Sequence, residues 1–298
     1  MNSPFKDIKE EVEKELRLIF DQRKNIPEKL HESMAYSVFA GGKRLRPILV
    51  VAGAEAVGGQ RASAMPVAAA FELIHTYTLI HDDLPAMDDD DLRRGMPTNH
   101  KKFGEATAIL AGDGLLTLAF EVLSEPYATA SPVNAEIRVK IINNVAKAVG
   151  ALGTVGGQEV DMASENQKRS DNDLEILEYI HTKKTGAMIT AAVVSGGLIG
   201  GANSDQISAL ERYGNGIGHA FQIVDDILDV TQTTHNLGKP AGSDTENIKL
   251  TYPAIIGLDE SRKLAKTQIK EALSALEIFG DAGQPLAGLA RYIEERSH

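Results

Sequence analysis

The chain of 298 residues contains no cysteine. Disulfides, thiolate metal sites and cysteine nucleophiles are therefore excluded together, and this composition fits the cytoplasmic location that we expect. Long uncharged apolar runs are missing as well. No apolar stretch reaches about 18 residues without a charge, so no membrane span is expected. The N-terminal segment is charged throughout, unlike a secretory signal peptide.

Positive charge is scarce, because 31 lysines and arginines stand against 42 aspartates and glutamates, a net charge of −11. A general nucleic-acid-binding protein carries the opposite sign, so no nucleic-acid partner is expected. The two signs are also segregated along the chain. Residues 62–92 contain no lysine or arginine, whereas residues 82–91 contain six aspartates. Basic residues gather elsewhere, at Lys43, Arg44 and Arg46, at Arg93 and Arg94, and at Lys183 and Lys184.

Signals for β-strands are weak, and apolar residues recur mainly at helical intervals of three and four. The sequence therefore predicts an all-α protein with long helices that are buried on most faces. No internal repeat and no domain linker is evident, so we expect one domain over residues 1–298. The expected helices cover residues 5–20, 27–40, 47–58, 63–83, 105–124, 136–164, 173–199, 204–231, 250–277 and 284–296.

Near matches to common nucleotide and metal motifs fail in detail. The glycines of residues 213–219 lack the preceding strand and the spacing of a dinucleotide-binding loop, so close helix packing is the better interpretation. In the segment GGKRLRP, Arg44 replaces the hydroxyl residue of a phosphate-binding loop. Leu92 and Arg93 stand where a calcium-binding loop needs a ligand and a glycine.

Two aspartate clusters are the main functional signal. The first, Asp82, Asp83 and Asp88, follows an apolar helix, and the second is the group Asp225, Asp226 and Asp229 in FQIVDDILDV. On a helix, Asp225 and Asp229 lie about 40° apart on one face. Carboxylates among apolar neighbours repel one another and lose hydration, so they need cations. All-oxygen ligand sets suit Mg²⁺ or Mn²⁺, and Mg²⁺ commonly shares its remaining positions with substrate phosphates.

A second anionic substrate would need a cationic pocket without acids. Arginine suits bidentate phosphate contacts and lysine provides a point charge. The candidates for this pocket are Lys43, Arg46, His75 and Arg94. The alternative for Lys43, Arg44 and Arg46 is a solvated basic loop, and the alternative for His75 is an ordinary core histidine.

The motifs GGKRLRP, DDLPAMDDDDLRRG, HTKKTG, FQIVDDILD and GKPAGSDTENIKLTYP together resemble the short-chain trans-prenyl diphosphate synthases. GGQEVDM is similar to an internal Gly-Gln-x-x-Asp element of the same family. The resemblance extends in order from about residue 36 to residue 260 and is closest to the bacterial farnesyl diphosphate synthases. It implies an all-α isoprenoid-synthase fold with a central cavity, and a homodimer.

The resemblance also implies a reaction, in which dimethylallyl or geranyl diphosphate condenses with isopentenyl diphosphate to give farnesyl diphosphate and pyrophosphate. It implies three Mg²⁺ ions, with Mn²⁺ as a possible substitute, held by Asp82, Asp88 and Asp225, while Asp83, Asp226 and Asp229 complete the two motifs. The implied contacts to the allylic diphosphate are Arg93, Lys184, Thr185, Gln222, Lys239 and Lys249. The implied contacts to isopentenyl diphosphate are Lys43, Arg46, His75 and Arg94. Asp82, Asp83, Asp88, Arg93, Lys184 and Asp225 would then be the catalytic group.

Product length is expected to depend on the helix before Asp82. Tyr77 is a candidate for the residue that stops the growing chain, and Thr78 and His75 are the other candidates. Helix geometry alone does not decide between Tyr77 and Thr78, and an ordinary core tyrosine is the alternative for Tyr77. The resemblance favours Tyr77, because bacterial farnesyl synthases carry an aromatic residue at this position. The alternatives are a geranylgeranyl diphosphate synthase, a non-catalytic partner subunit of a longer-chain synthase, and a terpene cyclase. The GGKRLRP segment and the two intact aspartate motifs count against the last two.

Overall fold

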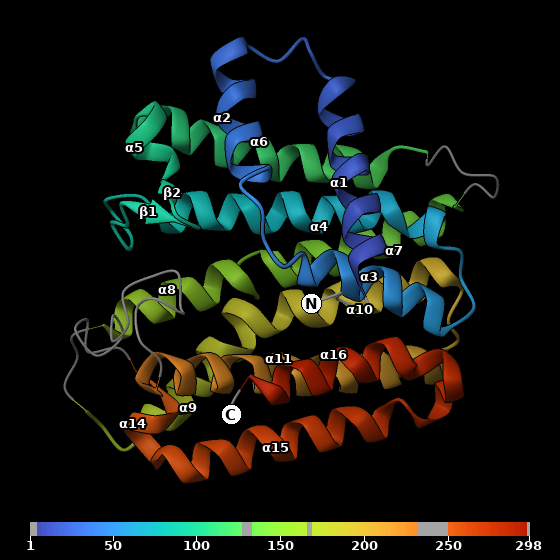
Figure 1. Ribbon diagram of the computed structural model, residues 1–298, viewed down its shortest axis with the longest axis vertical. Helices are drawn as coiled ribbons and strands as arrows, with labels where there is room; N and C mark the ends of the chain where they lie inside the picture. Colours follow the sequence, from blue (N-terminus) through green and yellow to red (C-terminus); the bar gives the residue numbers. More distant parts are fainter. Residues whose placement is uncertain (1–4, 127–132, 166–168, 232–249, 297–298) are drawn as a thin grey trace.

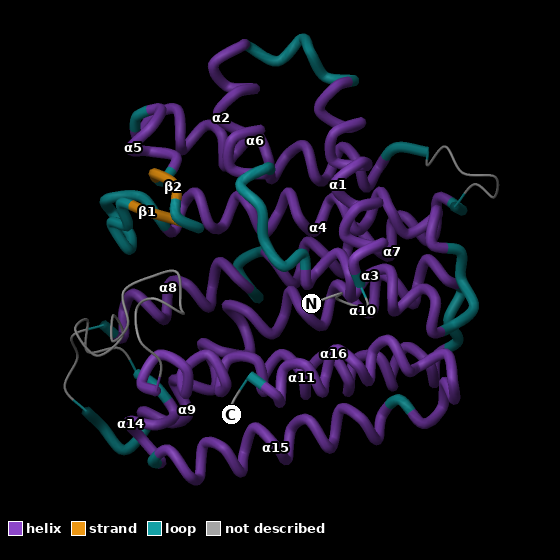
Figure 2. The backbone as a smooth tube through the Cα atoms, in the orientation of Figure 1, coloured by secondary structure: helices purple, strands orange, loops and turns teal. Residues whose placement is uncertain are grey.

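The computed structural model describes residues 5–126, 133–165, 169–231 and 250–296. Most of these residues are helical, which confirms the predicted all-α class (Figures 1 and 2). In chain order the elements are α1 (Lys6–Asp21), α2 (Glu28–Val38), α3 (Leu45–Ala56), α4 (Arg61–Asp82), β1 (Leu92–Arg93), β2 (Met96–Pro97), α5 (Asn99–Phe103), α6 (Glu105–Ser124), α7 (Ala135–Val149), α8 (Thr154–Ser164), α9 (Asp173–Ile180), α10 (Ala187–Gly200), α11 (Ser204–Thr231), α14 (Tyr252–Ile256), α15 (Leu258–Ala275) and α16 (Gln284–Glu295).

Three expected helices are interrupted. The one predicted over residues 136–164 is wrong as a single element, because it breaks between α7 and α8, where Gly150 and Gly153 stand. The expected helix 250–277 is divided between α14 and α15 by Gly257, whose φ of 82° is a conformation that ends a helix. Between α9 and α10 the chain forms one π-helical turn, η1 (His181–Gly186). A short antiparallel hairpin, β1–β2, also escaped the sequence analysis.

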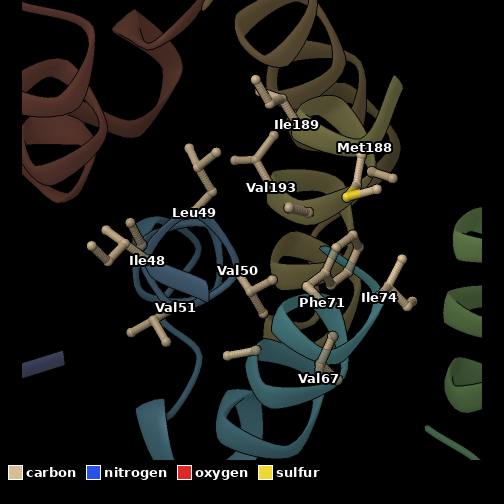
Figure 3. Close-up of a cluster of buried hydrophobic side chains, with 14 of the residues drawn as sticks. Ile48, Leu49, Val50, Val51, Val67, Phe71, Ile74, Met188, Ile189 and Val193 are labelled. Atoms are coloured by element: carbon tan, nitrogen blue, oxygen red, sulfur yellow. The ribbon is translucent and has the colours of Figure 1, made fainter. Parts of the chain in front are cut away.

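Helices α3, α4 and α10 supply a large part of the buried core and carry few charged residues. Leu49 of α3 lies beside Val193 of α10, and Val50 of α3 lies toward Phe71 of α4 (Figure 3). Ile48 and Val51, on other sides of α3, are also buried, as are Val67 and Ile74 of α4 and Met188 and Ile189 of α10. Helix α10 contains no charged residue, which is typical of a helix that is buried all round. This apolar centre fixes the relative positions of the longer helices around it.

Helices α3 and α10 approach each other unusually closely. A Cβ atom at Gly53 would lie 2.5 Å from the carbonyl oxygen of Val193, and one at Gly196 would lie 2.1 Å from that of Val50. Each glycine therefore faces the backbone of the other helix, and no side chain fits at either position.

Helix α6 is the one helix of the described residues that is long and apolar enough to cross a membrane by composition. Asp113 interrupts it, and 44% of its apolar window is buried. It packs against α4 and α2, as a core helix does.

The arrangement brings the ends of α4 and α11 to one side of the molecule. The β1–β2 hairpin, which follows α4, lies on the same side as α8, α9 and α14 (Figure 1). Both aspartate clusters stand at C-terminal ends of helices, so this side carries the concentrated negative charge.

We expect Gly196→Ala to lower the free energy of unfolding by about 1–3 kcal/mol, since the new methyl group would meet a backbone carbonyl that only helix displacement can move. Urea denaturation measures this change. Gly288→Ala in α16 is the matched control, because its new Cβ would lie 3.9 Å from the Phe5 ring. Alanine is also the better helix former, so the control should unfold at the same or a higher urea concentration. Equal losses in the two variants would contradict the packing argument.

Candidate active site

A cavity of about 450 Å³ separates the ends of α4 and α11. We call it the acid cavity, because aspartates from both clusters line it together with Asp90 and Asp161. The members of the predicted clusters that it brings together are Asp82 and Asp88 on one side and Asp225, Asp226 and Asp229 on the other. Arg93, Lys184 and Gln222, three of the predicted substrate contacts, lie in the same wall.

Asp82 is the carboxylate of the first cluster whose pKa departs most from its ordinary value. Burial raises its pKa to about 6, and the charges of Asp88 and Asp83 act in the same direction, against Lys184 and Arg93. Its ionised form therefore lacks sufficient compensation from the protein. A cation added beside Asp82 would supply it.

Asp83 has a different environment, because it already has a cationic partner. The Arg93 Nε atom donates to Asp83 Oδ1 at 2.6 Å, and Arg93 also pairs with Asp90 at 3.0 Å. Asp83 is 3% exposed and lies with Arg93 in the wall of a different cavity. The structure thus places Asp83 as the support of Arg93.

The aspartates of the second cluster also have different partners. Asp225 Oδ1 accepts from Arg296 Nη2 at 2.9 Å, and the Arg296 guanidinium lies over the Phe221 ring. Asp226 Oδ2 accepts from the backbone N–H of Tyr252 at 2.9 Å, and its other oxygen lies 3.8 Å from His181 Nε2. Asp226 therefore connects α11 to the start of α14.

The donors in the acid cavity are carboxylate oxygens, which fit Mg²⁺ by their chemistry. Within the described ranges, no three acidic or histidine side chains converge as a ready metal site. Mg²⁺ commonly keeps water ligands and shares the phosphates of a bound substrate, so it does not need a site enclosed by protein alone. Asp82, Asp88, Asp225 and Asp229 line the cavity in which such an ion would bind.

The π-helical turn η1 positions Lys184 and Thr185. A Cβ atom at Gly157 of α8 would lie 2.3 Å from the Lys184 backbone nitrogen, so α8 presses directly on this turn. Lys184 Nζ donates to Asp161 Oδ2 at 2.6 Å. π-Helical turns commonly occur at functional sites, and here the turn directs a lysine into the acid cavity.

A second cavity of about 470 Å³ adjoins the first, since Leu79, Asp82 and Lys184 line both. We call it the apolar cavity. Its wall includes Tyr77 and Thr78 from α4 with Met87, Val155, Met162 and Met188. The structure thus places both predicted chain-length residues beside Asp82, in a space that can take a hydrocarbon tail.

Of the four residues predicted for the cationic pocket, Arg46 and His75 line the apolar cavity. The charge of Arg94 acts on both of them, whereas the charges that act on Lys43 are those of Arg296 and Asp225. Burial lowers the pKa of Arg46 to about 10, and burial with the charges of Arg46 and Arg94 lowers the pKa of His75 well below its usual range. Among the residues that the structure describes, no partner accepts from the buried Arg46 Nε. An incoming anion would relieve this concentration of positive charge.

Arg44, by contrast, belongs to the scaffold. It is 2% exposed and pairs with Glu72 and with Glu13 Oε1, the latter at 2.6 Å. A solvated loop is therefore wrong for Arg44. It packs under the loop while Lys43 is directed outward.

Sequence reasoning missed Arg296 and gave no role to Asp161 or Glu72. Arg296 stands 71 residues from its partner, and no local pattern distinguishes it from other terminal basic residues. Asp161 belongs to the recognised GGQEVDM element, which was a usable signal. Lys239 and Lys249 lie outside the described residues.

A family comparison agrees with this geometry. The polyprenyl synthetase model matches residues 27–278. The chain belongs to the polyprenyl synthetase family. It is 51% identical, over 91% of its length and 73% of the relative, to a heterodimeric geranylgeranyl pyrophosphate synthase large subunit of Arabidopsis thaliana chloroplasts.

Two solved structures give the same result for the fold. An FPP/GFPP synthase of Zymomonas mobilis matches with a TM-score of 0.84 and 37% identity, over 98% of this chain and 100% of that one. A geranyltransferase of Legionella pneumophila matches with a TM-score of 0.83 and 32% identity, over 97% and 95%. The protein is a head-to-tail trans-prenyl diphosphate synthase of a family that generally uses Mg²⁺.

The raised pKa of Asp82 leads to a prediction for the metal-free protein. An acid whose pKa is higher in the folded state destabilises that state above its folded pKa, here about 6, and no longer does so below its unfolded value. Asp82→Asn removes the ionised form. We expect it to raise the free energy of unfolding by about 2 kcal/mol at pH 7.5 in EDTA, with the gain lost as the pH falls from about 6 to 4.

Urea unfolding at several pH values measures this gain. Asp281→Asn, at an exposed position outside both cavities, is the control and should show no gain at any pH. A gain for Asp82→Asn that is independent of pH would show that desolvation of the carboxylate is not its cause.

Proposed function

We propose that this protein makes farnesyl diphosphate from isopentenyl diphosphate and dimethylallyl or geranyl diphosphate. The observation that carries the proposal is the Tyr77 side chain in the wall of the apolar cavity. Tyr77 lies five residues before Asp82, which is roughly 7.5 Å along the helix axis. A bulky ring at this depth limits the tail that can grow from a diphosphate held at Asp82.

In this proposal the allylic diphosphate occupies the acid cavity and its tail enters the apolar cavity. Mg²⁺, with three ions expected and Mn²⁺ as a substitute, would supply positive charge to the leaving diphosphate when bound. Asp82, Asp88 and Asp225 would hold the ions, with Asp229 beside them and Asp83 and Asp226 serving as supports. Arg93, Lys184, Thr185 and Gln222 would contact the diphosphate, as would Lys239 and Lys249.

The chain's own residues then guide the reaction. Arg93 and Lys184 stabilise the charge that builds on the departing diphosphate as the C–O bond breaks. The apolar wall excludes water from the allylic cation. Lys43, Arg46, His75 and Arg94 hold isopentenyl diphosphate, whose double bond attacks C1 of the cation. The proton lost in the last step goes to the released pyrophosphate.

The second candidate is a geranylgeranyl diphosphate synthase. The 51% identical relative carries that name, as does a 50% identical relative from Catharanthus roseus. A non-catalytic subunit is disfavoured by the two intact aspartate clusters that face one cavity. A homodimer is the proposed assembly, and the exposed apolar residues Ile109 and Leu110 of α6 and Val139 of α7 support it. The cytoplasmic location remains a proposal as well, since the plant relatives are named chloroplastic.

Chromatography of the products made from dimethylallyl and isopentenyl diphosphates with Mg²⁺ tests the function. We expect the fifteen-carbon diphosphate as the main product. A main product of twenty carbons would support the geranylgeranyl synthase instead. A failure to consume isopentenyl diphosphate would contradict both and support a cyclase or a partner subunit.

Substitutions at the two anion sites are expected to change the kinetic constants of different substrates. Lys43→Ala or Arg46→Ala should raise KM for isopentenyl diphosphate about tenfold or more, because each removes a charge-assisted contact worth about 1.5–3 kcal/mol. Arg93→Ala should act mainly on the allylic substrate. Steady-state kinetics with each substrate varied in turn measure both. Equal effects of all three variants on both substrates would contradict the assignment.

Tyr77→Ala should open the apolar cavity and shift the main product from fifteen carbons to twenty or more. Condensation should persist, since the diphosphate contacts are made by other residues. Thr78→Ala removes far less volume from the same wall and serves as the comparison. If Tyr77→Ala stays active and still stops at fifteen carbons, Tyr77 does not limit the product.

A further inference from the structure

Tyr77 does not hold its position alone, because the His81 ring packs against it. The two rings lie one helical turn apart on α4, with centroids 5.6 Å apart and planes at 83°. This edge-to-face arrangement is a favoured geometry for two aromatic rings. Among the described residues, His81 is the one aromatic ring in such contact with Tyr77, and both rings line the apolar cavity.

The His81 ring is in turn fixed by α6. Its Nε2 atom lies 3.0 Å from the carbonyl oxygen of Ile109. Since a carbonyl only accepts, Nε2 carries the hydrogen in this bond. A histidine that bonds a backbone carbonyl of a packed helix has little freedom to rotate.

Gly112 of α6 makes room for this ring. A Cβ atom at Gly112 would lie 2.1 Å from His81 Nε2 and 2.4 Å from its Cδ2. The ring therefore occupies a hollow that only glycine leaves open. The contacts run in order from α6 through His81 to Tyr77 and the apolar cavity.

We propose that His81 is a positioning residue for product length: held by Ile109 and Gly112, it fixes the Tyr77 ring across the path of the growing tail. This inference rests on the proposed prenyl transfer and deepens it. In the proposed function, neither His81 nor Tyr77 contacts a diphosphate. The product should then become longer when a change on α4 loosens the contact between His81 and Tyr77. It should become shorter when a change on α6 compresses that contact.

His81→Ala loosens the contact. Tyr77 loses the ring behind it and the cavity gains volume, so the ratio of twenty- to fifteen-carbon product should rise about tenfold, the equivalent of 1.4 kcal/mol. His81→Gln keeps an N–H donor that can reach Ile109 and should restore most of the wild-type ratio. The ratio of the two products is measured separately for each variant, so a change in overall turnover does not affect it.

Gly112→Ala compresses the contact, because the new methyl group drives the His81 ring from α6 toward the cavity. The share of ten-carbon product should rise. Gly114→Ala on the same helix is the matched control, since its Cβ would meet the flexible Met34 side chain at 3.2 Å instead of His81. It should leave the product ratio unchanged. Thermal unfolding of each variant checks that the compared proteins are folded.

The inference is overturned if His81→Ala is active and keeps the wild-type ratio, or if His81→Gln changes the ratio as much as His81→Ala does. It is also overturned if Gly112→Ala folds and shifts products to greater length. Failure of the proposed function gives a different result. A wild-type protein that makes mainly twenty carbons contradicts the farnesyl assignment, while the shift from wild type to His81→Ala still tests the role of His81.

Discussion

The desolvation of carboxylates around the acid cavity is the constraint on which the site depends. Two helices direct aspartates into one space of about 450 Å³, and burial raises the pKa of Asp82 to about 6. The protein compensates part of this charge itself, through Arg93 at Asp83 and Arg296 at Asp225. In the proposed function, cations that bind together with a diphosphate would compensate the remainder. Substrate binding would then supply the positive charge that ionisation of the substrate needs.

The apolar centre of the molecule makes this unfavourable arrangement possible. Helices α3 and α10 meet backbone to backbone at Gly53 and Gly196, and α4 packs on both. Such a centre tolerates little displacement, because dense packing resists changes of volume. The aspartates of the acid cavity are therefore held in positions from which they would move apart if the helices were packed loosely. The same rigidity places the apolar cavity directly beside Asp82, so charge separation and tail binding share one wall.

Much of this could be predicted from the sequence, where the signal is local. The aspartate clusters have helical spacing and apolar flanks, and Tyr77 has a fixed register relative to Asp82. Pairings between distant segments could not be predicted in this way. Arg44 pairs with Glu72, which is 28 residues away in the sequence. His81 contacts Ile109 and Gly112 on another helix, and no local pattern predicts that these two helices are neighbours. The π-helical turn also escaped prediction, because helical periodicity barely changes when one residue is inserted into a turn.

The most direct test of the account is the binding of divalent ions with and without pyrophosphate, measured by titration with Mn²⁺ and detection of the free ion by electron paramagnetic resonance. The account predicts weak binding to the protein alone and tight binding of about three ions once pyrophosphate is present, since waters and phosphate oxygens complete the coordination. Asp225→Asn should weaken the tight binding. The same number of tightly bound ions in the absence of pyrophosphate would contradict the account, because the carboxylates would then form a complete metal site by themselves.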